Sequence, residues 1–185
     1  GRPQFDPLIV HVPDFNAVSR YACDIPEQAR LLAKRFWPGP LTLLLKKKDN
    51  IPDLVTAGLD TVGLRCPDHP LTHKLLASIP FPLAAPSANP FGYVSPTRSE
   101  HVEEQLGNKI PYILDGGSCK VGVESTIVGF ENGLPLIFRL GGIAIEQIET
   151  LIRKVNVRTH STSNPNGPGQ LQSHYAPHKK VFPAE

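Results

Sequence analysis

The chain has 185 residues, of which 40% are hydrophobic and 19% charged, so it can bury a core, and this composition argues against global disorder. A formal net charge of +2, with the histidines neutral, is too small to predict nucleic-acid binding by itself. No apolar run approaches the length of a membrane span. The three cysteines are scattered, which fits a reduced cytoplasmic protein better than a disulfide framework or a cysteine-rich zinc site.

The predicted elements follow from apolar periodicity and its interruptions. Strands are expected over residues 8–12, 41–45, 61–66, 81–85, 111–115, 125–130 and 135–140. Helices are expected over residues 26–37, 70–79, 97–106 and 143–155. Asp24 is the predicted N-cap of the first helix. Glu131-Asn132-Gly133, between the last two strands, is typical of a tight hairpin turn.

Strands and helices alternate along most of the chain, and one antiparallel hairpin comes late. This pattern predicts an α/β fold with a mixed parallel and antiparallel sheet. Residues 156–169 are rich in Ser, Asn, Thr, Gly and Pro, which is typical of a flexible linker. The sequence contains no Met and opens on a loop-like segment, so we expect it to be a fragment of a longer protein.

The segment from Leu83 to Pro90 reads LAAPSANP and is the most informative in the chain. An apolar strand ends at Pro86, and Ser87 and Asn89 follow two residues apart, so an extended chain would place both side chains on one face. A hydroxyl and an amide together offer donors and acceptors to a polar ligand, and ligands of open α/β sheets bind beyond strand ends. The alternative is a turn whose residues merely end the strand.

Further polar and glycine-rich signals stand at the ends of apolar runs. They are Arg2, Arg65, Gly116-Gly117, Glu124-Ser125-Thr126, Arg139, Gly141-Gly142 and His174-Tyr175. Arginine forks suit phosphate or carboxylate, and adjacent glycines let backbone N–H groups approach an anion. The set predicts a nucleotide site built from several loops, without a Walker or Rossmann glycine pattern. Each feature alone also fits an ordinary turn or surface residue.

Seven segments then carry a resemblance. They read GRPQFDPLIVH, KRFWPGPLTLLL, VGLRCPDHP, PLAAPSANPFG, ILDGG, VESTIV and FRLGG, and they run from Gly1 to about Gly142. Together, and in this order, they resemble the YrdC family, the threonylcarbamoyl-AMP synthases. The tail GPGQLQSHYAPHKKV resembles the linker of the longer members, with Gly167 where their motif has Ser.

The resemblance implies a twisted open mixed sheet flanked by helices. It also implies three regions: a YrdC-like catalytic domain over residues 1–155 that lacks its N-terminal elements, a linker or lid over 156–178, and the start of a second domain over 179–185. The implied reaction forms threonylcarbamoyl-AMP and pyrophosphate from L-threonine, bicarbonate and ATP, with Mg²⁺. Such a cytoplasmic nucleotidyltransferase involves no membrane and supplies the enzymes that complete threonylcarbamoyladenosine (t6A) on tRNA.

Site residues are implied residue by residue. The family hallmark K-x-R followed by S-x-N matches Arg2, Ser87 and Asn89, the implied catalytic residues, and its lysine would fall before Gly1. The implied substrate-binding residues are Arg2, His11, Arg65, Ser87, Ser125 and Thr126. The implied nucleotide-binding residues are Asn89, Ser125, Thr126, Arg139, His174 and Tyr175, of which the last two would close as a lid. The metal ligands stay open.

Two other functions remain to be distinguished. A non-catalytic RNA-binding module of the same fold would show salt-dependent RNA binding without nucleotide turnover, although aromatic and basic residues are not interleaved here. A carbamoyl-transfer domain of a hydrogenase-maturation protein would be accompanied by cysteine-rich zinc motifs, which this sequence lacks.

Overall fold

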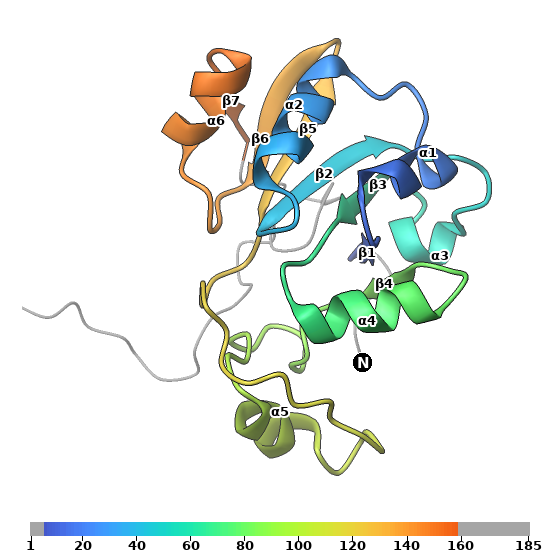
Figure 1. The fold of residues 1–185 in the computed structure, drawn as a ribbon, viewed down its shortest axis with the longest axis vertical. Helices are drawn as coiled ribbons and strands as arrows, with labels where there is room; N and C mark the ends of the chain where they lie inside the picture. The colour runs from blue at the N-terminus through green and yellow to red at the C-terminus, as the bar shows by residue number, and fades with distance from the viewer. Residues whose placement is uncertain (1–5, 159–185) are drawn as a thin grey trace, which may run out of the picture.

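The computed structural model describes residues 6–158, which form a seven-stranded mixed sheet with the order β4-β1-β3-β2-β5-β6-β7 (Figure 1). The strands are β1 (Ile9–His11), β2 (Leu41–Lys46), β3 (Thr61–Arg65), β4 (Leu83–Ala85), β5 (Thr126–Glu131), β6 (Leu134–Arg139) and β7 (Asn156–Val157). The pairs β1/β3, β2/β5 and β6/β7 are parallel, and the other neighbours are antiparallel. This confirms the predicted α/β class and the mixed sheet.

The helices connect these strands, and most of them lie on one side of the sheet. They are η1 (Phe15–Ala17), α1 (Val18–Tyr21), α2 (Glu27–Phe36), α3 (Asp53–Thr56), α4 (Pro70–Ser78), α5 (Ser99–Leu106) and α6 (Ile145–Ile152). In Figure 1, α2 lies in front of β2 and β5, whereas α5 and its flanking loops extend below the sheet. No helix between residues 6 and 158 combines the length and apolarity that crossing a membrane requires.

The helix predicted over residues 26–37 is confirmed, but its predicted N-cap is wrong. Pro26 occupies the N-cap position, and α2 begins at Glu27. Asp24 instead adopts a left-handed backbone conformation with φ of 51°, and its carboxylate accepts a hydrogen bond from Lys46 Nζ at 3.0 Å. The Asp24 carboxylate therefore binds Lys46, at the end of β2, instead of capping α2. At the other end, Trp37 Nε1 donates to the Leu41 carbonyl at 2.8 Å.

The predicted hairpin between β5 and β6 is confirmed. Asn132 and Gly133 have φ of 50° and 77°, so both central residues of the turn are left-handed. A two-residue loop of this kind matches the right-handed twist of the strands that it joins, and Asn-Gly is the pair that accepts it with least strain. The turn pairs Glu131 with Leu134 and sets the register of the hairpin.

The strand predicted over residues 111–115 is wrong. The segment pairs with no strand of the described chain, and Tyr112 and Leu114 are 89% and 68% exposed. Periodicity detects apolar residues but not whether a neighbouring strand exists to pair with them. The short helices α1 and α3 carry too few residues for a periodic signal. At the other end of the domain, β7 occupies the first two residues of the predicted linker.

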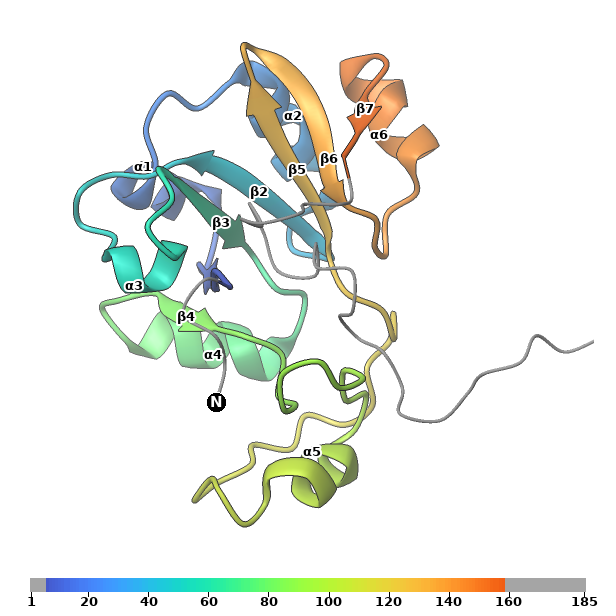
Figure 2. The same ribbon diagram turned by 180° about the vertical axis from the view of Figure 1, so that it is seen from behind.

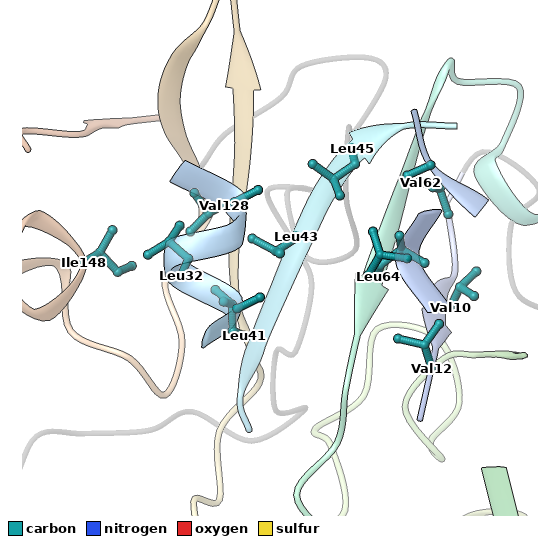
Figure 3. Packing of buried hydrophobic residues seen from close by; sticks show 14 of the residues in the cluster. Val10, Val12, Leu32, Leu41, Leu43, Leu45, Val62, Leu64, Val128 and Ile148 are labelled. Carbon is teal, nitrogen blue, oxygen red and sulfur yellow. The ribbon is translucent and has the colours of Figure 1, made fainter. Parts of the chain in front are cut away.

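The main core follows from the strand register. Val10, Leu64, Leu43, Val128 and Ile137 are register partners across five strands, and each is at most 1% exposed. We call them the core row. Their side chains point toward the helices, and Figure 3 shows Leu43 and Val128 packed near helix residues. The helical residues that complete this core include Leu32 of α2 and Ile148 of α6.

The opposite face of the sheet is less covered. Figure 2 looks onto this face and shows β2, β3 and β5 in front of α2. We call it the open face. It carries a small second cluster, the open-face cluster, made of Leu44, Ile127, Leu136 and Phe138. Gly129 makes room for it, since a Cβ there would lie 2.6 Å from the Phe138 ring.

We predict that Leu43→Ala lowers the free energy of unfolding by about 2–5 kcal/mol, because Leu43 is at the centre of the core row and its neighbours cannot fill the cavity. Urea denaturation measures the loss. Leu54→Ala is the matched control: Leu54 is 75% exposed, so its loss should stay within about 0.5 kcal/mol. Similar losses in the two variants would contradict this account of the core.

Candidate active site

A second row of side chains crosses the open face beside the core row. It consists of His11, Arg65, Thr42, Ile127 and Arg139, which are register partners on β1, β3, β2, β5 and β6. We call it the site row. Strand pairing therefore aligns a histidine and two arginines that lie far apart in sequence. A row with this charge favours an anionic ligand.

A β-bulge places Arg139 in this row. Ile127 pairs with Arg139 while Val128 pairs with Ile137, so Phe138 is an extra residue on β6. Without the bulge, Phe138 and Arg139 would point to opposite faces because side chains alternate along a strand. With it, Phe138 joins the open-face cluster and Arg139 still reaches the same face.

Ser125, the residue before β5, holds the Arg139 side chain. Arg139 Nε donates to the Ser125 carbonyl at 3.0 Å, and Nη2 donates to Ser125 Oγ at 2.9 Å. Ser125 Oγ also lies 2.7 Å from Thr42 Oγ1. All three residues are buried, with Arg139 only 8% exposed. The guanidinium is thus fixed in direction by paired hydrogen bonds, which a lysine ammonium could not reproduce.

Burial and mutual repulsion disfavour the charged forms of His11 and Arg65 in the site row. Burial, followed by repulsion from Arg65, lowers the pKa of His11 from its usual 6.5. Burial, followed by repulsion from Arg139, lowers the pKa of Arg65 from its usual value. His11 Nδ1 lies 3.2 Å from the Leu83 carbonyl oxygen, and Arg65 Nε donates to the Gly39 carbonyl at 3.2 Å. An anion bound here would relieve the repulsion.

A cavity of about 190 Å³ adjoins the site row. His11, Arg65, Ser87, Ser125 and Arg139 all line it, so the structure brings these five predicted site residues together. A groove of about 930 Å³ adjoins it along α4 and the 115–123 segment and shares His11 and Arg65 with it. The small cavity suits a ligand of amino-acid size, and the groove offers space for a larger one.

Ser87 and Asn89 lie differently from the sequence expectation. The chain is extended only to Ala85 and bends at residues 88–89, so the two side chains do not share one face. Ser87 lines the cavity. Asn89 does not; its amide donates to the Pro90 and Tyr93 carbonyls at 2.9 and 3.0 Å, which closes a local loop. Its Oδ1 atom is buried without a hydrogen-bond partner.

Thr126 is placed away from the cavity. Its buried hydroxyl accepts a hydrogen bond from the Ile143 N–H and donates one to the Ile143 carbonyl, each at 3.0 Å. Both of these bonds tie the start of β5 to the segment before α6. The hydroxyl is therefore engaged by the backbone, and the predicted ligand contact of Thr126 stays a prediction.

Gly141 supports the same end of β5. A Cβ at Gly141 would overlap the Glu124 carbonyl and the Thr126 N–H, which are backbone atoms that cannot move aside. The next residue, Gly142, donates its N–H to the Glu124 carbonyl at 3.0 Å. The glycine pair thus serves close packing of two backbones around Ser125.

Three predicted site residues, Arg2, His174 and Tyr175, lie outside the described residues, as do most of the predicted linker and the predicted start of a second domain. Thr42 is a site-row residue that the sequence did not single out. Its only signal is one hydroxyl within the apolar run Leu41–Leu45, and nothing in that run reveals the partner 83 residues later.

Comparison with known proteins gives the family. The Sua5/YciO/YrdC family model, described as "Telomere recombination", matches residues 1–141, and the model of the threonylcarbamoyl-AMP synthase C-terminal domain matches residues 143–185. The chain belongs to the Sua5/YciO/YrdC family. This confirms the resemblance predicted from its motifs.

Two curated relatives are each called threonylcarbamoyl-AMP synthase. The Pyrococcus abyssi protein is 43% identical over 100% of this chain and 56% of its own length. The Bacillus subtilis protein is 45% identical over 96% of this chain and 52% of its own length. The chain thus spans about half the length of these relatives.

The crystal structure of P. abyssi Sua5 complexed with L-threonine matches this fold with a TM-score of 0.92 and 44% identity. The match covers 96% of this chain and 53% of that one. The predicted sheet architecture is confirmed by this match.

We predict that Thr126→Val lowers the free energy of unfolding by about 1–3 kcal/mol, because the buried N–H and C=O of Ile143 lose their partner. Urea denaturation measures the loss. Thr150→Val is the control, since the Thr150 hydroxyl binds the Gln147 carbonyl at the exposed surface. An unchanged midpoint for Thr126→Val would show that its hydroxyl does not stabilise this junction.

The two cysteines near the site should differ in reactivity. Burial raises the pKa of Cys66 to about 11, so its thiol stays protonated below that pH, whereas Cys119 is exposed and lines the cavity. At about pH 8 we expect iodoacetamide to label Cys119 and spare Cys66 in the folded protein, and to label both in urea. Peptide mass spectrometry reads the result; equal labelling in the folded protein would contradict the burial of Cys66.

Proposed function

We propose that the protein carrying this chain is a threonylcarbamoyl-AMP synthase, a nucleotidyltransferase that joins L-threonine, bicarbonate and ATP. The single observation that carries the proposal is the site row, in which Arg65 and Arg139 line one cavity together with the Ser125 hydroxyl. The names of relatives at 43% and 45% identity support the same activity and favour it over RNA binding or carbamoyl transfer.

The chemistry requires cations more than proton transfer. A carbamate oxygen of N-carboxy-threonine attacks the α-phosphorus of ATP, the bond from that phosphorus to the bridging oxygen breaks, and pyrophosphate leaves. Two anions must approach each other, so fixed guanidiniums and N–H or O–H donors lower the barrier by screening and by positioning. Arg65, Arg139 and Ser125 are such groups, and they are already held in place by the sheet.

The predicted site residues that line the cavity are assigned roles according to their chemistry. Arg65 and His11 would contact the carboxylate or carbamate of threonine, and Arg139 with Ser125 would contact phosphate oxygens. Ser87 would orient the substrate from the loop after β4. Roles for Arg2, His174 and Tyr175 rest on the family motif alone, as do the roles of Asn89 and Thr126.

Mg²⁺ fits this site as a partner of the nucleotide. The described residues hold no cluster of three His, Cys, Asp or Glu side chains, whereas the Glu124 carboxylate offers hard oxygen atoms at the cavity. Mg²⁺ commonly takes one or two carboxylates together with substrate phosphates, so Glu124 would hold it there. Bound in this way it would neutralise charge on the triphosphate.

The remaining proposals concern the larger context. Residues 1–155 would be the catalytic domain, 156–178 a linker that closes over the cavity, and 179–185 the start of a second domain. We place the protein in the cytoplasm, where its product would pass to enzymes that modify tRNA to t6A. These proposals rest on the family and on the sequence pattern.

The test is pyrophosphate release by the full-length protein with ATP, bicarbonate and L-threonine, with each omitted in turn. We expect release to require threonine, and Arg139→Lys to lower kcat/KM by at least about tenfold, because lysine cannot keep both bonds to Ser125. Arg30→Lys, an exposed arginine on α2, is the control.

Two outcomes would overturn the proposal. Release that does not depend on threonine would remove the substrate assignment. Salt-dependent RNA binding without any nucleotide turnover would favour the RNA-binding module instead.

A further inference from the structure

We propose that Thr42 is a positioning residue of this site, which acts through Ser125. Its hydroxyl donates to Ser125 Oγ, so that the Ser125 proton is directed into the cavity as a donor to an anionic oxygen. The activity part of the test rests on the proposed function, whereas the binding part does not.

The placement of Thr42 is unusual for its strand. β2 reads LTLLLK, and the four leucines around Thr42 are almost fully buried. Thr42 itself is 0% exposed and occupies the site row between Arg65 and Ile127. A buried hydroxyl among leucines loses its water and must be compensated by a hydrogen bond. Valine, which has nearly the same shape, would fill this position without that requirement.

The number of donors and acceptors around Ser125 Oγ indicates which hydroxyl donates in the Thr42–Ser125 hydrogen bond. Ser125 Oγ can accept two hydrogen bonds and donate one, and a guanidinium can only donate. Arg139 Nη2 therefore fills one acceptor position of Ser125 Oγ, at 2.9 Å. Among the described residues, Ser125 Oγ at 2.7 Å is the only hydrogen-bond partner of the Thr42 hydroxyl.

Two arrangements of the Thr42–Ser125 pair are possible. If Ser125 donated, the Thr42 proton would stay buried without an acceptor, which is the more costly defect. If Thr42 donates, its proton is satisfied and both acceptor positions of Ser125 are filled. The second arrangement is favoured. It leaves the Ser125 proton as the only unused hydrogen-bonding capacity of that hydroxyl.

The remaining proton of the Ser125 hydroxyl can point into the cavity. Ser125 and Arg139 line the cavity, and Thr42 lies behind them. Thr42 therefore turns a hydroxyl that could accept or donate into one that only donates. Beside a guanidinium, such a donor selects phosphate or carboxylate oxygen over groups that bring their own protons.

The experiment compares Thr42→Val, which keeps the shape and removes the hydroxyl, with Thr42→Ser, which keeps the hydroxyl. The matched control is Thr56→Val: Thr56 is equally buried and its hydroxyl donates to the Leu59 carbonyl at 2.9 Å, on α3 rather than in the site row. All variants are made in the full-length protein.

The first readout is the rise in melting temperature on adding inorganic phosphate. We expect wild type, Thr42→Ser and Thr56→Val to respond alike, and Thr42→Val and Ser125→Ala to lose at least half of the response. The second readout is threonine-dependent pyrophosphate release. We expect Thr42→Val to lower kcat/KM about tenfold, Thr42→Ser to stay within about threefold of wild type, and Thr42→Val in a Ser125→Ala background to cause no further loss.

The outcomes separate the two proposals. A wild-type protein without threonine-dependent release overturns the proposed function, while the phosphate response still tests Thr42. Equal responses of Thr42→Val and Thr42→Ser in either readout overturn the positioning role, and so does a wild-type protein with neither release nor a phosphate response. Losses in Thr42→Val that add to those of Ser125→Ala also overturn it, since Thr42 would then not act through Ser125.

Discussion

Strand register is the constraint on which this structure depends. Successive side chains of a strand point to opposite faces, so a shift of one residue in any pairing would exchange the two faces. The core row, from Val10 to Ile137, is apolar and sealed by helices. The adjacent site row, from His11 to Arg139, is cationic and faces a cavity. Burial of the core row, which follows from the hydrophobic effect, therefore also aligns the site row.

Charge and hydrogen bonding then act within that frame. Arg65 and Arg139 repel each other, and burial adds to the cost of the charge on Arg65. The bonds of Arg139 to Ser125, and of Ser125 to Thr42, hold the guanidinium in one orientation in spite of this cost. This rigid pair of arginines favours an anion, because a bound negative charge would offset their mutual repulsion.

Much of this could be predicted from the sequence. The chemistry of their side chains was enough to predict Arg65, Ser125 and Arg139 as site residues, and all three line one cavity. The Asn132–Gly133 turn follows from local backbone preference. The false strand at 111–115 and the unsuspected role of Thr42 have a common cause: both depend on which segments become neighbours, and neighbours across 83 residues leave no local pattern.

Residue identity and short-range spacing were enough to predict the apolar alternation, the turns, the cationic and hydroxyl residues and the family. Which of these residues act together depends instead on how distant segments pair and pack. The bulge at Phe138 re-aims Arg139, the bend after Ala85 separates Ser87 from Asn89, and the backbone of Ile143 engages Thr126. Each of these results from packing between distant segments, whose free energy depends on contacts that no stretch of sequence contains.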